Sequence, residues 1–223
     1  MPLTALESAD KTGLLATLRL DAIRDHHCTE INLASQMVGQ LQTALEEQSS
    51  KDGACLAMSA KWLEGQKGGS PLLKELLGLG GAVNEKALSG IVETHKSIGG
   101  GPDEAHKFAR SLKGEMQYST FRRFDSRSND LGDALFDEKE GVALGPLILL
   151  GVYGGNLSHA MALDMTKHIF FDPNFGEFKF NSGANLKSFL NRVFTLEKDV
   201  HVSKWWYVRK KAYCTFATAW VYK

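Results

Sequence analysis

The chain has only three cysteines in 223 residues, Cys28, Cys55 and Cys214, and they lie far apart in the sequence. Their small number and wide spacing argue against a disulfide framework and fit a reducing compartment at the site of action. Net charge is also absent, because 26 basic side chains balance 26 acidic ones. The surface as a whole therefore has no excess positive charge for nucleic acid or an anionic membrane, and we expect no nucleic-acid partner.

Long hydrophobic runs are missing as well. The longest apolar stretch, residues 142–153, is too short to span a bilayer and contains Gly145 and Pro146. The N-terminus shows no basic segment followed by an apolar one, so no secretory signal is visible. We expect no transmembrane segment, and if the protein leaves its cell we expect a route without a cleavable signal peptide.

Composition and hydrophobic patterning predict one globular domain over residues 1–223, divided into three parts. Residues 1–50 form a predicted helical N-terminal extension, because apolar residues recur at helical spacing. Residues 51–141 contain a helix that starts near Cys55, a flexible break at 65–71 and further predicted helices at 72–77, 85–96 and 103–113.

From residue 142 onward the chain becomes rich in β-branched and aromatic residues at alternating spacing. This pattern predicts a helix at 184–195 and strands at 143–153, 158–166, 169–171, 177–180, 205–211 and 214–222. A helical N-terminal half packed on a C-terminal antiparallel β-sheet is an α+β plan.

Cys55 lies at the predicted start of a helix. The small residues Gly53 and Ala54 precede it, and apolar residues such as Met58 and Trp62 follow at three- and four-residue spacing. In the first turn, unpaired backbone N–H groups and the helix dipole favour a thiolate over a thiol. Taken by itself, Cys55 also fits a small buried thiol with no catalytic role.

Two later strands supply a base and an acid. His159 shares one face of its predicted strand with Met161 and Leu163, and Asp172 stands where the next strand ends in an Asp-Pro-Asn turn. Neighbouring antiparallel strands would hold the His159 imidazole against the Asp172 carboxylate. A nucleophile, a base and an orienting acid are the parts of a papain-like site. His168 is the rival base, although it falls at the predicted turn between the strands.

Three stretches of this chain resemble the YopT/AvrPphB-type papain-like cysteine peptidases, a family of bacterial effectors. The stretches are Gly53-x-Cys55-x-Ala57-x-Ser59-x-x-Trp62, Ser158-His159-Ala160-x-Ala162 and Phe170-Phe171-Asp172-Pro173-Asn174-Phe175-Gly176-Glu177-Phe178. The resemblance implies a papain-like fold in which the cysteine helix packs on the sheet that carries the histidine. It also implies that Cys55 is the nucleophile, His159 the base and Asp172 the orienting acid.

Papain-like enzymes usually place a Gln or Asn several residues before the cysteine as an oxyanion-hole donor. The candidates here are Gln48, Ser49 and Ser50, of which we assign Gln48, and the Cys55 backbone N–H is the other donor. We expect no cofactor and no metal, because His95 and His106 lack partners at the spacing of metal ligands.

The resemblance further implies a secreted bacterial effector or toxin that enters a target cell, either a eukaryotic host or a competing bacterium. Its partners would be a protein substrate and, in addition, an immunity protein or a chaperone. Two alternatives stay open at this point. The same triad serves amidases and deamidases that act on peptidoglycan or glutamine side chains, and a non-catalytic binding module would keep the fold alone.

Overall fold

The computed structural model describes residues 20, 22–32, 54–69, 72–76, 83–98, 102–112, 116–125, 131–136, 144–154, 157–173, 176–193 and 216–223. Within these residues, every helix is too short or too polar to cross a membrane.

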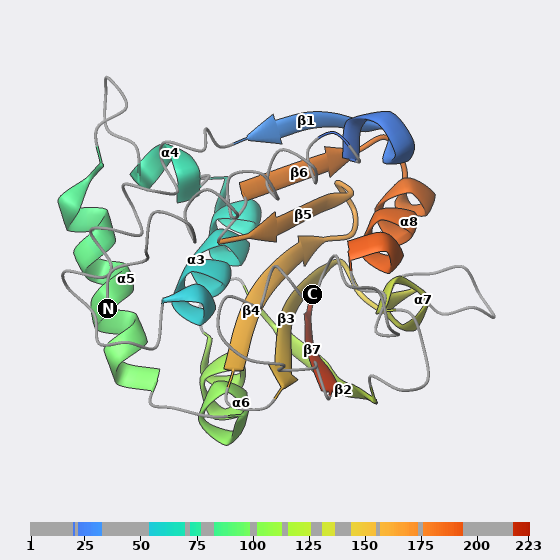
Figure 1. Cartoon of the computed structure of the whole chain (residues 1–223). Helices are drawn as coiled ribbons and strands as arrows, with labels where there is room; N and C mark the ends of the chain where they lie inside the picture. The colour runs from blue at the N-terminus through green and yellow to red at the C-terminus, as the bar shows by residue number, and fades with distance from the viewer. Residues whose placement is uncertain are drawn as a thin grey trace.

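A seven-stranded sheet forms the centre of the molecule (Figure 1). In spatial order its strands are β1 (Cys28–Asn32), β6 (Gly176–Phe180), β5 (Ile169–Asp172), β4 (Leu157–Asp164), β3 (Leu147–Gly154), β7 (Phe216–Tyr222) and β2 (Tyr118–Asp125). Every neighbouring pair is antiparallel. Strands β3 to β6 follow one another along the chain, so local hairpins build the middle of the sheet, and β1, β7 and β2 are added by long-range pairing.

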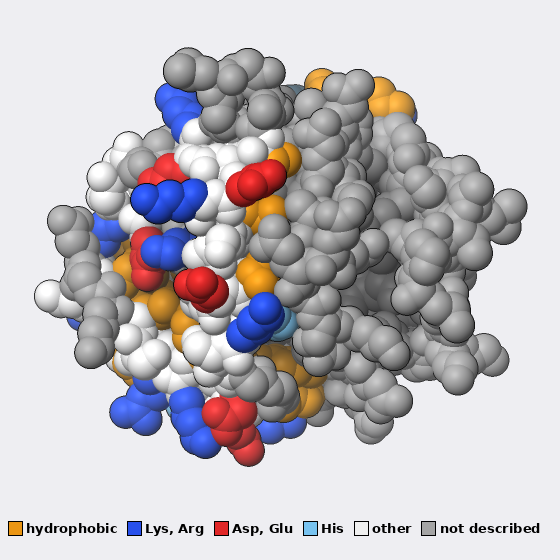
Figure 2. Space-filling model, turned by 90° about the vertical axis from the view of Figure 1, so that its left-hand side faces the viewer, with side chains coloured by type: hydrophobic (Ala, Val, Ile, Leu, Met, Phe, Trp, Pro, Cys, Tyr) orange, Lys and Arg blue, Asp and Glu red, His pale blue; other side chains and the backbone are white. Residues whose placement is uncertain are grey.

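Helices lie against both faces of the sheet (Figure 1). One face is covered by α3 (Cys55–Gly68), α4 (Leu72–Leu76), α5 (Glu85–Ile98) and α6 (Pro102–Ser111). The opposite face carries α7 (Leu131–Leu135) and α8 (Gly183–Val193). Seen from the side of α5, acidic and basic side chains are interspersed over the described part of the surface (Figure 2).

Alternation along the strands divides the apolar side chains between two cores. On β3, Leu147 and Leu149 belong to the core under α3, whereas Ile148 and Leu150 belong to the core under α8. Successive residues of a strand point to opposite faces, so a continuous hydrophobic run is what a strand buried on both faces requires. The two cores therefore hold α3 and α8 on opposite sides of the same strands.

The α+β plan is confirmed, with a sheet from the C-terminal part of the chain and helices packed on it. The strands predicted between residues 143 and 180 coincide with β3 to β6 to within a few residues, and the predicted helix 184–195 is α8. The cysteine helix starts at Cys55 and runs on through residues 65–68, where the sequence predicted a flexible break. It ends at Gly69, whose φ of 73° lies in the left-handed region that glycine adopts without strain.

The prediction that the chain is helical before residue 142 is wrong in two places. Residues 28–32 form β1 and pair with β6, and residues 118–125 form β2 and pair with β7. Both are edge strands whose partners lie far along the chain. Because strand formation depends on packing against such partners, local patterning underestimated both elements.

Other predictions lie outside the described residues. These are Gln48, Cys214, the strand 205–211 and most of the helical extension 1–50. The prediction that residues 1–223 form one domain, made of the parts 1–50, 51–141 and 142–223, stays a prediction.

Candidate active site

Helix α3 places Cys55 at its first position. The preceding residue, Ala54, accepts a hydrogen bond at its carbonyl from the Met58 N–H, at 2.9 Å. None of the described side chains caps this end of the helix. A negative charge on the half-buried, free Cys55 thiol would therefore meet the positive end of the helix dipole.

Strands β4 and β5 bring His159 and Asp172 together. The strands pair only from Asp164 and Ile169 to Ala162 and Phe171. Beyond these paired residues, the two strands are in contact through the side chains of His159 and Asp172. His159 Nε2 lies 3.1 Å from both Oδ1 and Oδ2 of Asp172. The side chains are 10% and 0% exposed, so the contact is shielded from water.

His159 also forms a side-chain hydrogen bond with Cys55. Because Asp172 engages Nε2, Nδ1 is the ring nitrogen left for the sulfur. Burial acts to lower the pKa of His159, but the charges and hydrogen bonds of Asp172 and Cys55 together outweigh it and raise that pKa to about 10. Burial likewise acts to raise the pKa of Cys55, whereas His159 and the Ala160 backbone lower it below its usual value. The geometry thus favours a thiolate beside an imidazolium.

The edge of β4 next to α3 contributes to this environment. The Ser59 hydroxyl donates to the Ala160 carbonyl at 3.0 Å, and the Ala160 backbone N–H forms a hydrogen bond with the Cys55 sulfur. The pairing of β5 with β4 ends at Ala162, so within the described part of the chain no strand pairs with β4 on this side at Ala160. Helix α3 supplies the missing partners, because buried backbone groups are costly when left unpaired. The same contacts fix the position of the sulfur.

Tyr153, near the end of β3, is a site residue that the sequence reasoning missed. Burial raises the pKa of its hydroxyl, which forms a hydrogen bond with Thr218, and the charge of Cys55 acts in the same direction. Its ring stacks on Phe216 with centroids 4.8 Å apart, so it stays fixed beside the site. The predicted strands 143–153 and 158–166 could have identified Tyr153, because a hairpin that joins them pairs it with Ser158, the neighbour of His159. The structure shows this pairing.

The rival base is placed elsewhere. His168 lies in the turn that joins β4 to β5, at the end of these strands opposite to the contact between His159 and Asp172. The proposed oxyanion donor Gln48 lies outside the described residues. Among the residues that the structure does describe, no group of three His, Cys, Asp or Glu side chains is arranged to hold a metal ion.

A cysteine at the start of a helix, packed against a sheet that carries a paired histidine and aspartate, is the arrangement of papain-like cysteine peptidases. The comparison with known families agrees with this class. Residues 138–202 match the family model of Peptidase C58, described as Yersinia/Haemophilus virulence surface antigen. The matched segment contains His159 and Asp172. This match confirms the resemblance to the YopT/AvrPphB type over that segment and supports a papain-like cysteine peptidase.

Among solved structures, the crystal structure of the Pseudomonas avirulence protein AvrPphB aligns with 81% of this chain and 94% of its own chain, with a TM-score of 0.42 and 14% sequence identity. No curated protein matches the sequence.

Proposed function

We propose that Cys55, His159 and Asp172 form the catalytic triad of this peptidase and that its substrate is a protein. The observation that supports the proposal is the hydrogen-bonded series from the Cys55 sulfur through the His159 ring to the Asp172 carboxylate. The raised pKa of His159 and the lowered pKa of Cys55 favour the ion pair near neutral pH. The thiolate is the reactive form of cysteine, so the nucleophile is ready before the substrate binds.

The proposed reaction passes through a thioester. The Cys55 thiolate attacks the carbonyl carbon of the scissile peptide, and the His159 imidazolium gives its proton to the departing amine. The carbon–nitrogen bond breaks, and the acyl group stays on sulfur. Water then attacks the thioester while His159 takes a proton from it, and the carboxylic product leaves with regeneration of the thiolate. Asp172 holds the ring in one orientation throughout and stabilises the imidazolium.

The negative charge that develops on the carbonyl oxygen needs donors. The backbone N–H of Cys55 at the start of α3 is one proposed donor, because it belongs to the unpaired first turn of the helix. The Gln48 side chain is the proposed second donor, on the strength of the family resemblance alone.

We further propose that the protein is a bacterial effector that acts inside a target cell, either a eukaryotic host cell or a competing bacterium. The support for this role is the description of the matching family as a virulence antigen. An immunity protein or a chaperone is a proposed additional partner.

The first test compares the wild type with Cys55→Ala in the bacterial cytosol, in the bacterial periplasm and in a eukaryotic cell. We expect growth inhibition in the compartment that contains the substrate and its loss in Cys55→Ala. Cys28→Ala is the matched control, because Cys28 is a buried cysteine on β1 at the far edge of the sheet. Equal toxicity of wild type and Cys55→Ala, or no effect of either anywhere, would contradict the proposal and favour a binding module.

Chemical labelling separates the remaining alternatives. An epoxide inactivator of thiol peptidases such as E-64 should modify Cys55 and leave Cys28 unmodified, as mass spectrometry of the digested protein would show. Protein fragments in the affected compartment would support the peptidase, whereas muropeptide products or deamidated glutamines would identify an amidase or deamidase with the same triad.

A further inference from the structure

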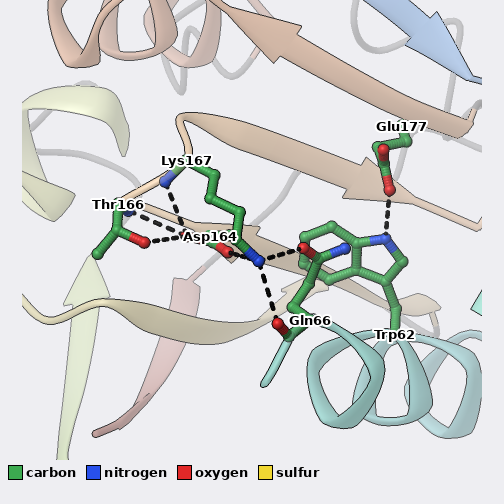
Figure 3. A network of polar contacts seen from close by, with 6 residues as sticks. All are labelled: Trp62, Gln66, Asp164, Thr166, Lys167 and Glu177. Carbon is green, nitrogen blue, oxygen red and sulfur yellow. Dashed lines mark hydrogen bonds and ion pairs between the residues drawn. The ribbon is translucent and has the colours of Figure 1, made fainter. Parts of the chain in front are cut away.

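One face of α3 contacts the sheet through four side chains with polar groups. Their positions are four, three and four residues apart, a spacing that places them in one line along a helix. On β4, Cys55 contacts His159 and Ser59 contacts the Ala160 carbonyl. Trp62 contacts the Glu177 carboxylate on β6, and Gln66 contacts the Lys167 ammonium group in the turn that joins β4 to β5. Figure 3 shows the last two contacts.

Trp62 makes two contacts with the hairpin formed by β5 and β6. Its indole Nε1–H donates to Glu177 Oε2 at 2.7 Å, and its ring stacks on Phe171 with centroids 5.3 Å apart and planes 3° from parallel. Phe171 directly precedes Asp172 on β5. Glu177 directly follows Gly176, which is the residue paired with Asp172 across the hairpin. A single buried indole therefore holds both strands next to the acid.

These contacts matter because His159 and Asp172 lie beyond the part of β4 and β5 that is paired through the backbone. The β4–β5 ladder ends with Ala162 and Phe171, so the separation of His159 and Asp172 is not set by strand register. Helix α3 instead contacts both β4, which carries His159, and the β5–β6 hairpin, which carries Asp172. Ser59 ties it to the histidine strand, and Trp62 ties it to the aspartate hairpin.

We propose that Trp62 and Glu177 are positioning residues, which hold the Asp172 carboxylate against His159 and so maintain the thiolate–imidazolium pair at Cys55. This inference rests on the triad proposed above. Glu177 is suited to the role because it is 9% exposed and its bond to the indole is a short, charge-assisted one.

Loss of the bond between Trp62 and Glu177 should shift the pH dependence of Cys55 alkylation to higher pH. In Trp62→Phe the stacking surface on Phe171 is kept and the indole N–H is lost. If Asp172 then moves away from His159, the pKa of His159 falls and the pKa of Cys55 rises toward its ordinary value. Alkylation of Cys55 should therefore need a higher pH. A purely structural loss of stability would lower the amount of folded protein. It would leave unchanged the pH at which the alkylation rate of Cys55 is half of its maximum.

The experiment measures the rate of Cys55 alkylation by iodoacetamide from about pH 5 to about pH 10, the range that spans perturbed and ordinary thiols. Mass spectrometry of the full-length chain after digestion counts the label at Cys55 alone. Trp220→Phe is the matched control, because Trp220 is equally buried in the same core and donates its Nε1–H to His106 Nδ1 at 2.9 Å. Near-ultraviolet circular dichroism checks the fold of each variant.

We expect the alkylation midpoint of Trp62→Phe to rise by about one pH unit. Because a thiolate of higher pKa is the better nucleophile, the reaction below the midpoint should be about threefold slower. Glu177→Ala should give the same shift. Glu177→Gln, which keeps an acceptor oxygen, should restore most of the wild-type profile, and Trp220→Phe should keep it entirely. If Trp62→Phe fails to fold, the comparison of Glu177→Ala with Glu177→Gln decides the question.

An unchanged midpoint in folded Trp62→Phe or Glu177→Ala would overturn the inference, and so would an equal shift in Trp220→Phe. A different result would overturn the proposed function instead. If wild-type Cys55 itself titrates as an ordinary thiol, near its reference pKa of 9.0, the ion pair does not exist.

Discussion

Replacing Asp172 by Asn tests the electrostatic origin of the reactive thiolate, because it keeps the shape of the side chain and removes its charge. The carboxylate, together with the Cys55 sulfur, holds the pKa of His159 at about 10 against burial, compared with an ordinary value of 6.5. That difference corresponds to roughly 5 kcal/mol in favour of the imidazolium. In Asp172→Asn burial is opposed only by the contacts with Cys55, so we expect the ring to be neutral at pH 7.

The loss of the imidazolium should then raise the pKa of Cys55. At pH 6, a thiol with the ordinary value of 9.0 is ionised to about one part in a thousand. A thiolate of higher pKa is the better nucleophile, which offsets about half of this loss on a logarithmic scale. We therefore expect alkylation of Cys55 by iodoacetamide at pH 6 to slow by roughly 30- to 100-fold.

Two readouts check this reasoning. Carbon-13-labelled histidine, with the His159 signal assigned from His159→Gln, should report a protonated ring at neutral pH in the wild type and a neutral ring in Asp172→Asn. The stability lost in the variant should be greatest below pH 6.5 and should fade as the pH rises through about 10, because a raised pKa stabilises the fold only while the proton is bound. A wild-type ring that is neutral at pH 7, or an unchanged alkylation profile, would refute the argument.

The other predictions concern stability. Ser59→Ala should lower the free energy of unfolding by about 1 to 3 kcal/mol, because the buried Ala160 carbonyl loses its donor, and it should also slow Cys55 alkylation; urea denaturation and the same alkylation assay measure both effects. Gly132→Ala should cost a similar 1 to 3 kcal/mol, because the added Cβ would collide with the Asn191 side chain and the Lys187 carbonyl oxygen. Since α7 and α8 lie on the face opposite α3, this variant should keep the wild-type alkylation profile, and a shifted profile would contradict the separation of the two cores.

Much of the fold was predictable because its elements repeat short-range patterns. The continuous apolar run of β3 and the turn after Asp172 are visible in a few residues, so β3 to β6 were predicted close to their observed bounds. The edge strands β1 and β2 were not. Their pairing partners β6 and β7 are remote in sequence, and a window of local residues contains no information about them.

The site divides in the same way. Cys55 at a helix start and Asp172 at a strand end are local features, so motifs and periodicity predicted both of them as site candidates, together with His159. Tyr153 was missed because its importance depends on the hairpin that sets it beside His159.

Local sequence predicts the chemical groups of the candidate site and the elements that carry them, since helix starts and strand ends depend on neighbouring residues. Only tertiary packing brings these groups together. Ser59 and Ala160 are 101 residues apart in the chain, and Trp62 and Glu177 are 115 apart. Contacts of this kind form only when both cores pack, and burial in those cores gives the charge of Asp172 its large effect on His159.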